Sequence, residues 1–247
     1  MNGVNTHRRN VACGFTLVAL LSIFGITTLL AAVFATTVRN ARVKQIQLQC
    51  ANNLRQIGVA AQMYAHDERE GRFPDCTGAV WPWDLPGSAA NSLIRYGATR
   101  DVFYCPGVPE QNSDELWNFT AGVAGTNGFR VTGYALAFKG AGRVRATNVT
   151  ESLAPIPYRI GNTEVQPPPS ERVVSADATL SVGSNEADRA RNRYTAVFGG
   201  STTPHRSPHL AGKLPAGGNL VFLDGHTEWK PFQKMRVRTE ADPTFWW

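Results

Sequence analysis

The chain has 247 residues, of which 43% are hydrophobic and 18% charged, and its formal net charge is +6 at pH 7. This composition is typical of a globular protein and excludes an intrinsically disordered chain, and the length beyond the N-terminal region suits one domain. The excess positive charge comes mostly from arginines spread singly. Because no Lys/Arg block or nucleic-acid motif is present, we expect no nucleic acid among the partners.

The N-terminal region begins with a short polar and basic segment, residues 1–14, followed by the uncharged run Phe15 to Val38. A helix over these 24 residues is about 36 Å long, which is enough to cross a bilayer. A secretory signal usually has a shorter apolar core, so a permanent single-pass anchor is favoured. Arg8 and Arg9 favour a cytoplasmic N-terminus, with the rest of the chain periplasmic or extracellular. Removal of the run by signal peptidase after Ala35 is the alternative.

Residues 39–70 continue the helical pattern with one apolar face. Apolar residues recur at spacings of three and four: Val43, Ile46, Cys50, Leu54, Ile57, Ala61 and Tyr64. No proline interrupts the chain between Phe15 and Phe73, so the sequence predicts one long helix that ends near Gly71 and Pro74. The second half of this helix needs an apolar partner surface, which we expect residues 71–247 to supply.

Residues 71–247 are rich in turns and aromatic residues and are predicted to form a β-rich head. A short helix is predicted over 88–97, and strands over 131–138 and 171–180. A hairpin with strands 219–223 and 226–230 is predicted to turn at Asp224-Gly225 in a two-residue type I′ turn. The predicted fold class is therefore α+β, a long N-terminal helix packed on an antiparallel β-sheet.

The C-terminal residues Phe245, Trp246 and Trp247 form a strongly apolar tail. Exposure of such a tail would be costly, so we expect it to dock on the domain or on a partner.

Four cysteines are present: Cys13, Cys50, Cys76 and Cys105. None belongs to a C-x-x-C pair, which argues against a zinc site or a thioredoxin-like site. In an oxidising compartment we expect one disulfide among the three cysteines that follow the apolar run. Cys105 is expected to pair with Cys50 or with Cys76, and the sequence leaves both pairings open.

The basic leader, Gly14, the tripeptide Phe15-Thr16-Leu17 and the apolar helix resemble the N-terminus of type IV pilin-like proteins, specifically type II secretion pseudopilins. The resemblance implies a pilin-like fold and cleavage by a prepilin peptidase between Gly14 and Phe15, with N-methylation of Phe15. The family has glutamate at the fifth mature position, where this chain has Ala19. That glutamate is held to neutralise a neighbouring subunit's N-terminal amine during assembly, so the departure bears on whether the chain polymerises.

Three further segments resemble parts of bacterial prepilin-like proteins. They are the helix end CANNLRQIGVAAQMYAHDEREGRFP (50–74), the Cys-Pro segment VFYCPG (102–107) and the His…Asp-Gly box HLAGKLPAGGNLVFLDGHTEW (209–229). The box commonly has nine residues between His and Asp, whereas fourteen separate His209 from Asp224 here.

Candidate chemistry is concentrated near the C-terminus. His209, Asp224 and His226 are of the residue types that bind divalent metals. The resemblance adds Ca²⁺, which some pseudopilins hold in C-terminal loops; no other cofactor is expected. The alternative is structural, with Asp224 in a turn and both histidines hydrogen-bonded within loops.

Catalysis has less support in the sequence. Ser175 and Asp177 with a distant histidine could form a hydrolase triad. No recognised catalytic motif accompanies them, so we do not expect an enzyme.

Three functions follow from these patterns. The first is a pseudopilin-like structural subunit in the cytoplasmic membrane, acting by helix bundling and head–head contacts, with the prepilin peptidase and other pilin-like subunits as partners. The second is an anchored or secreted module that binds a glycan or a protein through Trp-rich loops such as residues 81–87. The third is an exported hydrolase.

Overall fold

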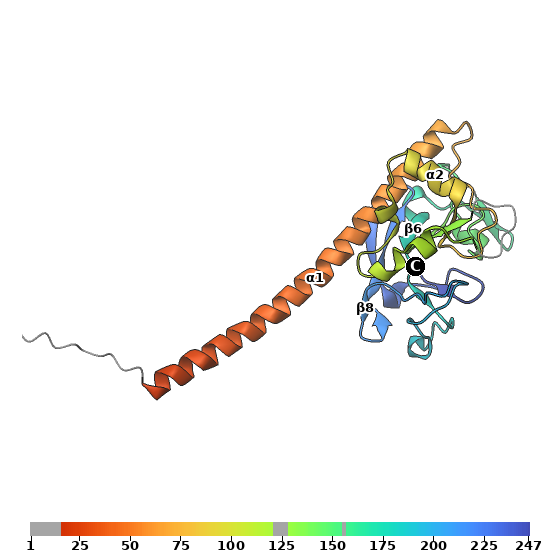
Figure 1. Ribbon diagram of the computed structural model, residues 1–247. Helices are drawn as coiled ribbons and strands as arrows, with labels where there is room; N and C mark the ends of the chain where they lie inside the picture. The colour runs from red at the N-terminus through yellow and green to blue at the C-terminus, as the bar shows by residue number, and fades with distance from the viewer. Residues whose placement is uncertain (1–15, 121–127, 155–156) are drawn as a thin grey trace, which may run out of the picture. The chain divides into compact units, whose positions relative to one another are not determined.

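The computed structural model describes residues 16–120, 128–154 and 157–247 (Figure 1). The chain divides into two units, Met1–Val43 and Lys44–Trp247. The α-helices are α1 (Leu17–Asp67), α2 (Gly87–Arg95) and α3 (Asp114–Trp117). The 3₁₀ helices are η1 (Arg100–Phe103), η2 (Pro109–Gln111), η3 (Ala146–Asn148), η4 (Pro169–Glu171), η5 (Arg189–Arg191) and η6 (Phe232–Lys234).

The strands of the described residues all belong to the second unit. They are β1 (Asp84–Pro86), β2 (Phe129–Val131), β3 (Tyr134–Leu136), β4 (Tyr158–Ile160), β5 (Thr163–Val165), β6 (Val173–Asp177), β7 (Leu180–Ser181), β8 (Leu210–Ala211), β9 (Leu214–Pro215), β10 (Gly217–Phe222), β11 (Thr227–Pro231) and β12 (Thr244–Phe245).

Helix α1 is one uninterrupted helix of 51 residues, as the absence of proline predicts. Its part in the first unit is apolar and exposed: Leu17 is 77% and Phe34 71% exposed. An 18-residue window of α1 has a mean hydropathy of 2.5 and is not buried. By length and composition, α1 therefore contains a segment that could cross a membrane, and it is the one such helix among the described residues.

The part of α1 in the second unit buries one face. The buried residues are Cys50, Leu54, Ile57, Gly58, Ala60, Ala61 and Ala65. Four of them, Cys50, Leu54, Ile57 and Ala61, are on the apolar face that the sequence predicts, so the predicted orientation of that face is confirmed. Tyr64 is only half-buried, because Ala65 takes the inward position in the last turn. The helix stops at Asp67, four residues before Gly71, whose φ of +62° continues no helix.

A four-stranded antiparallel sheet in the order β11-β10-β6-β3 forms the centre of the second unit. Residues opposite one another in neighbouring strands point to the same face. Tyr134, Leu136 and Val221 belong to the same core cluster as the buried residues of α1. The expected α+β arrangement, a long helix with an antiparallel sheet, is confirmed; the pilin-like topology stays a prediction.

Aromatic residues cover the other face of the sheet. Ala135, Ala176 and Leu220 pack there in a second core cluster with Trp246 and Trp247. The C-terminal tail is therefore part of the core: β12 pairs with β7, and Trp246 is fully buried with its indole N–H donating to Ser181 Oγ at 2.8 Å. Of the two expected sites for this tail, the structure selects the domain itself.

Two local predictions need correction. The predicted strand 131–138 is broken, because Thr132 and Gly133 separate β2, which pairs with β1, from β3 in the central sheet. The predicted type I′ turn is wrong. The β10–β11 connection has a Gly225 N–H to Phe222 C=O bond and a positive φ only at Gly225, which is the three-residue turn with a glycine bulge.

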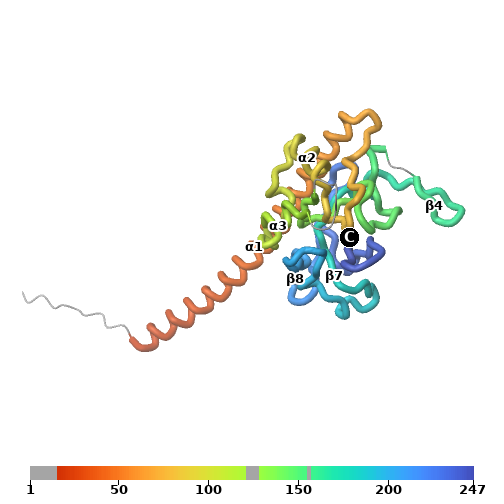
Figure 2. Tube along the Cα trace, turned by 45° about the vertical axis from the view of Figure 1, so that its right-hand side comes forward, coloured from red at the N-terminus to blue at the C-terminus, as the bar shows by residue number. Residues whose placement is uncertain are grey.

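The remaining strands form short hairpins. The β4–β5 hairpin extends from the rest of the second unit, as Figure 2 shows, and Ile160 within it is 61% exposed. The β8–β9 hairpin follows His209 and leads into β10.

We predict that Trp246→Ala lowers the free energy of unfolding of the head by about 3–5 kcal/mol, because it removes a fully buried indole and its hydrogen bond. The matched control is Phe198→Ala, since Phe198 is 58% exposed and should change stability by no more than about 0.5 kcal/mol. Urea denaturation of both variants measures the difference. Equal stability of the two variants would contradict a core role for the tail.

Candidate functional site

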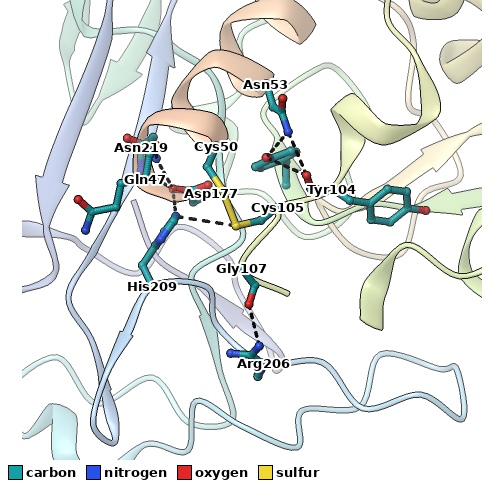
Figure 3. Close-up of a disulfide and its surroundings, with 11 residues drawn as sticks. Gln47, Cys50, Asn53, Tyr104, Cys105, Gly107, Asp177, Arg206, His209 and Asn219 are labelled. Atoms are coloured by element: carbon teal, nitrogen blue, oxygen red, sulfur yellow. Dashed lines mark hydrogen bonds and ion pairs between the residues drawn. A yellow bond between two sulfur atoms is a disulfide. The ribbon is translucent and has the colours of Figure 1, made fainter. Parts of the chain in front are cut away.

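The most concentrated set of reactive side chains lies where α1 meets the sheet (Figure 3). Cys50 of α1 and Cys105 form a disulfide whose Cα atoms are 5.4 Å apart. His209 Nε2 lies 4.0 Å from Cys105 Sγ and 3.1 Å from Asp177 Oδ2. The side chains of His209 and Asp177 are 2% and 0% exposed, so the whole group is enclosed. We call these four residues the Cys–His–Asp cluster.

Strand register explains why a carboxylate lies in this layer. Asp177 ends β6 opposite Tyr134, whose side chain belongs to the core shared with α1. Asn219 of β10 donates to Asp177 Oδ2 from its backbone N–H at 2.6 Å and from its Nδ2 at 2.9 Å. Asp177 Oδ1 is buried and has no hydrogen-bond partner among the described residues. The carboxylate is therefore held firmly through one oxygen and unsatisfied at the other.

Polar contacts on both sides of Cys50 fix the helix against the head. Asn219 Nδ2 donates to the Gln47 carbonyl at 3.1 Å, and Asn53 Nδ2 donates to the Tyr104 carbonyl at 3.1 Å. These contacts come one turn before and one turn after the disulfide, so three successive turns of α1 are tied to the sheet and to the loop that follows η1.

His209 has an unusual backbone. Its φ is +54°, which non-glycine residues adopt rarely and at a cost. Its ring packs edge-on against Trp229, with 5.3 Å between the ring centroids. The surroundings of the ring and the Asp177 contact hold this conformation, so His209 is positioned by tertiary structure.

The predicted metal ligands are not brought together. Asp224 and His226 pair with each other at 2.5 Å on the β10–β11 turn, where their side chains are 37% and 43% exposed. His209 lies in the buried cluster, and no close group of three ligands in the described residues contains all three. The sequence-based site of His209, Asp224 and His226 is therefore wrong as a set. Asp224 lies on the β10–β11 turn, where it pairs with His226. His209 is buried elsewhere, in contact with Asp177.

The structure contains one of the two expected disulfide pairs. Cys105 bonds Cys50, and Cys76 is a free, buried cysteine. Burial raises the pKa of the Cys76 thiol to about 12, so it stays protonated and unreactive near neutral pH. The predicted processing residues Gly14 and Phe15 lie outside the described residues.

The residues suggested for other chemistry are enclosed. Ser175 Oγ is buried without a partner among the described residues, and His209 contacts Asp177 and Cys105. No serine–histidine pair therefore joins Ser175 to His209. None of the six tryptophans, all of which are described, is exposed; Trp83, Trp246 and Trp247 are fully buried or nearly so.

A second buried polar group surrounds Trp83. Burial raises the pKa of the Asp84 carboxyl to about 7, although the backbone N–H groups of Trp81 and Val80 donate to it at 2.9 and 3.2 Å. The His205 ring packs against Trp83 with an interplanar angle of 33° and 4.2 Å between the ring centroids. Burial lowers the pKa of His205 to about 4, so its ring is neutral at pH 7. Trp83 belongs to the second core cluster, and the buried Asp84 carboxyl and His205 ring lie beside it.

An open groove of about 590 Å³ lies elsewhere, between the β8–β9 hairpin and the segment after η5. Arg193 and Lys213 line it, together with the buried Tyr194. It includes no member of the Cys–His–Asp cluster.

Sequence reasoning missed the importance of Asn219. The residue alternates with Val221 and Leu223 along a strand whose apolar members face inward, and a polar residue in that register signals a buried polar contact. The pairing of His209 with Asp177 had no such signal, because the two residues lie in separate segments.

Comparison with known proteins adds no assignment: no protein-family model, no curated protein and no solved structure matches this chain.

We predict that Cys105→Ser lowers the free energy of unfolding of the oxidised head by about 4 kcal/mol, because the lost cross-link closes a loop with a sequence separation of 55 residues. The matched control is Cys76→Ala, which changes a buried free cysteine and should cost about 1 kcal/mol. Denaturation in metal-free, non-reducing buffer compares the two. A smaller loss for Cys105→Ser than for Cys76→Ala would contradict the assigned pairing.

The raised pKa of Asp84 makes the stability of the head depend on pH. The folded state binds the Asp84 proton more tightly than the unfolded state does. The bound proton therefore adds to the free energy of unfolding, fully below about pH 4, and this addition is lost as pH rises through about 7. Asp84→Asn should therefore gain stability relative to the wild type between pH 4 and pH 8, by on the order of 2–4 kcal/mol. Urea titrations at both pH values test this. A difference between variant and wild type that does not change with pH would refute it.

Proposed function

We propose that the chain is a pilin-like structural subunit, held in the cytoplasmic membrane by the apolar part of α1, with the head on the periplasmic or extracellular side. It acts by association: apolar helices bundle with those of other pilin-like subunits, and heads contact one another. The continuity of α1 carries the proposal. A single helix is apolar and exposed over its first part and buries one face in the head over its second part.

The two halves of α1 require different surroundings. The large side chains of residues 17–43 are exposed, and burying such surface in lipid or against other apolar helices is strongly favourable. The second half is cross-linked to the head at Cys50 and hydrogen-bonded at Gln47 and Asn53. A force on the apolar half is therefore transmitted to the folded head through one helix, as a filament or secretion subunit needs.

The competing functions have less support. A glycan-binding platform normally presents exposed aromatic rings, whereas Trp83, Trp246 and Trp247 are buried and the other three tryptophans are only partly exposed. A serine hydrolase needs a nucleophile that reaches a base, and the Ser175 hydroxyl is buried without a partner among the described residues. We therefore keep association as the proposed mechanism.

The first test is the mature N-terminus of the protein in native membranes, measured by mass spectrometry. We expect a chain that begins at Phe15 and carries an N-methyl group, and we expect Gly14→Leu to abolish this cleavage. The matched control is Gly25→Leu, because Gly25 lies within α1 and a Cβ added there would have no atom within 4 Å. This variant should mature normally.

Other termini would contradict the proposal in distinct ways. A chain that begins at Thr36 would make the apolar run a discarded signal. An intact Met1 or Asn2 would leave a plain membrane anchor. Normal maturation of Gly14→Leu would exclude processing at this glycine.

A further inference from the structure

Three members of the Cys–His–Asp cluster are close enough to one another to share a metal ion. Cys50 Sγ, Cys105 Sγ and His209 Nε2 all lie within 4.8 Å of one another, and they form the one such group in the part of the chain that the structure describes. They come from α1, from the loop after η1 and from the residue before β8. The lack of a C-x-x-C pair argues against zinc only when both cysteines belong to one loop. Here the fold assembles the ligands from separate segments.

Asp177 lies beside this group through its contact with His209, but it is not one of the three residues whose ligand atoms all lie within 4.8 Å of one another. Its Oδ2 lies 3.1 Å from His209 Nε2, and Cys105 Sγ lies 4.0 Å from the same nitrogen. In a tetrahedral zinc site with ordinary bond lengths, these separations are about 3.4 Å for N and O and about 3.6 Å for N and S. These two contacts are within about 0.4 Å of the separations that zinc requires, and the Asp177 carboxylate would have to approach the sulfur atoms to complete a tetrahedron.

The two sulfur atoms must move apart for a metal to enter. Tetrahedral coordination places two thiolates about 3.8 Å apart, which a covalent disulfide forbids. We propose that Cys50, Cys105, His209 and Asp177 bind Zn²⁺ when the Cys50–Cys105 disulfide is reduced. The disulfide and the zinc site are then alternative ways to join α1 to the same loop.

A dithiol can serve as the reductant of the Cys50–Cys105 disulfide. The dithiol gives two electrons and two protons, becomes a cyclic disulfide and leaves Cys50 and Cys105 as thiols. Zn²⁺ then displaces the two thiol protons into solvent. His209 binds through the Nε2 lone pair while its ring proton resides on Nδ1. Because one Zn²⁺ and two thiolates sum to zero, binding adds no net charge to the buried site.

The surroundings fit zinc better than the calcium implied by the family resemblance. Sulfur and imidazole nitrogen suit Zn²⁺, whereas Ca²⁺ takes six to eight oxygen ligands. Asn219 orients the Asp177 carboxylate with two hydrogen bonds, as residues behind a metal ligand commonly do. The other oxygen of this carboxylate, Asp177 Oδ1, is buried without a hydrogen-bond partner among the described residues.

Burial determines how the metal would enter. Cys50 and Cys105 are 0% and 1% exposed, so a folded head offers little access. Zinc would therefore bind as the reduced chain folds, and its binding would stabilise the head before oxidation. In the reduced chain the metal would then perform the cross-linking that the disulfide performs in the oxidised chain.

The test uses the full-length protein in detergent, unfolded and refolded without oxygen in a phosphine reductant with Co²⁺ or Zn²⁺. We expect one metal per reduced chain and none bound at this site in the oxidised chain. Bound Co²⁺ should show visible absorption typical of tetrahedral coordination and near-ultraviolet thiolate-to-cobalt charge transfer. Reduced protein without stoichiometric metal, or bound cobalt without the thiolate bands, would overturn the proposal.

Variants identify the ligands. His209→Ala and Asp177→Asn should each weaken Zn²⁺ binding at least tenfold. The matched controls His226→Ala and Asp224→Asn alter an equivalent histidine–carboxylate pair on the exposed turn and should bind as the wild type does. If the control pair lowers affinity as much as the cluster pair, the assigned site is wrong.

Alkylation of the wild-type chain tests the proposal even if the cluster variants fail to fold. Zn²⁺ should slow alkylation of Cys50 and Cys105 by iodoacetamide at least tenfold in the reduced chain, as measured on their peptides by mass spectrometry. It should also raise the thermal unfolding midpoint of the reduced chain. Equal alkylation rates with and without zinc would overturn the proposal.

Discussion

The packing of one face of α1 on the central antiparallel sheet is the interaction on which the rest of the head depends. The helix brings small residues to the contact, and Gly58 is so close that a Cβ there would lie 2.9 Å from Val221 Cγ1. This close approach brings Cys50 within bonding distance of Cys105, and Gln47 and Asn53 within reach of the sheet and the loop after η1. A bulkier face on α1 would move all three contacts apart.

Strands β3, β6 and β10 are mostly buried on both faces of the sheet, whereas the edge strand β11 is partly exposed. One face meets α1, and the other meets the aromatic layer built from Trp83, Phe232 and the C-terminal tryptophans. Such a sheet has little room for polar groups, so each that occurs needs a specific partner. Asn219 satisfies Asp177 Oδ2 with two hydrogen bonds, whereas Asp177 Oδ1 has no partner among the described residues. His209 completes the group with an unfavourable backbone angle.

The proposed anchor and the proposed zinc site concern different parts of the same helix. In the proposed function, the apolar part of α1 is the membrane anchor and the surface for association. The turn that carries Cys50 joins the helix to the head by a disulfide, and the proposed zinc site would replace this cross-link in the reduced chain.

The sequence by itself determined the features that depend on neighbours along the chain. The charge-free run and the three–four periodicity specified a long helix and the phase of its buried face, because both follow from the helical repeat. The glycine of Asp224-Gly225 marked the hairpin, although not its turn type, which depends on how many residues the strands leave unpaired. The tail of Phe245, Trp246 and Trp247 had to be covered because of its hydrophobicity.

Only the tertiary structure decided what depends on residues far apart in sequence. Cys105 had two suitable partners, and the packing of α1 selected Cys50 over Cys76. His209 looked like a companion of Asp224 and His226 because they are close in sequence, yet the fold carried it into the interior beside Asp177. A local pattern records the repeat of a helix or strand, whereas the meeting of separate segments is set by the balance of packing, burial and hydrogen bonding over the whole head.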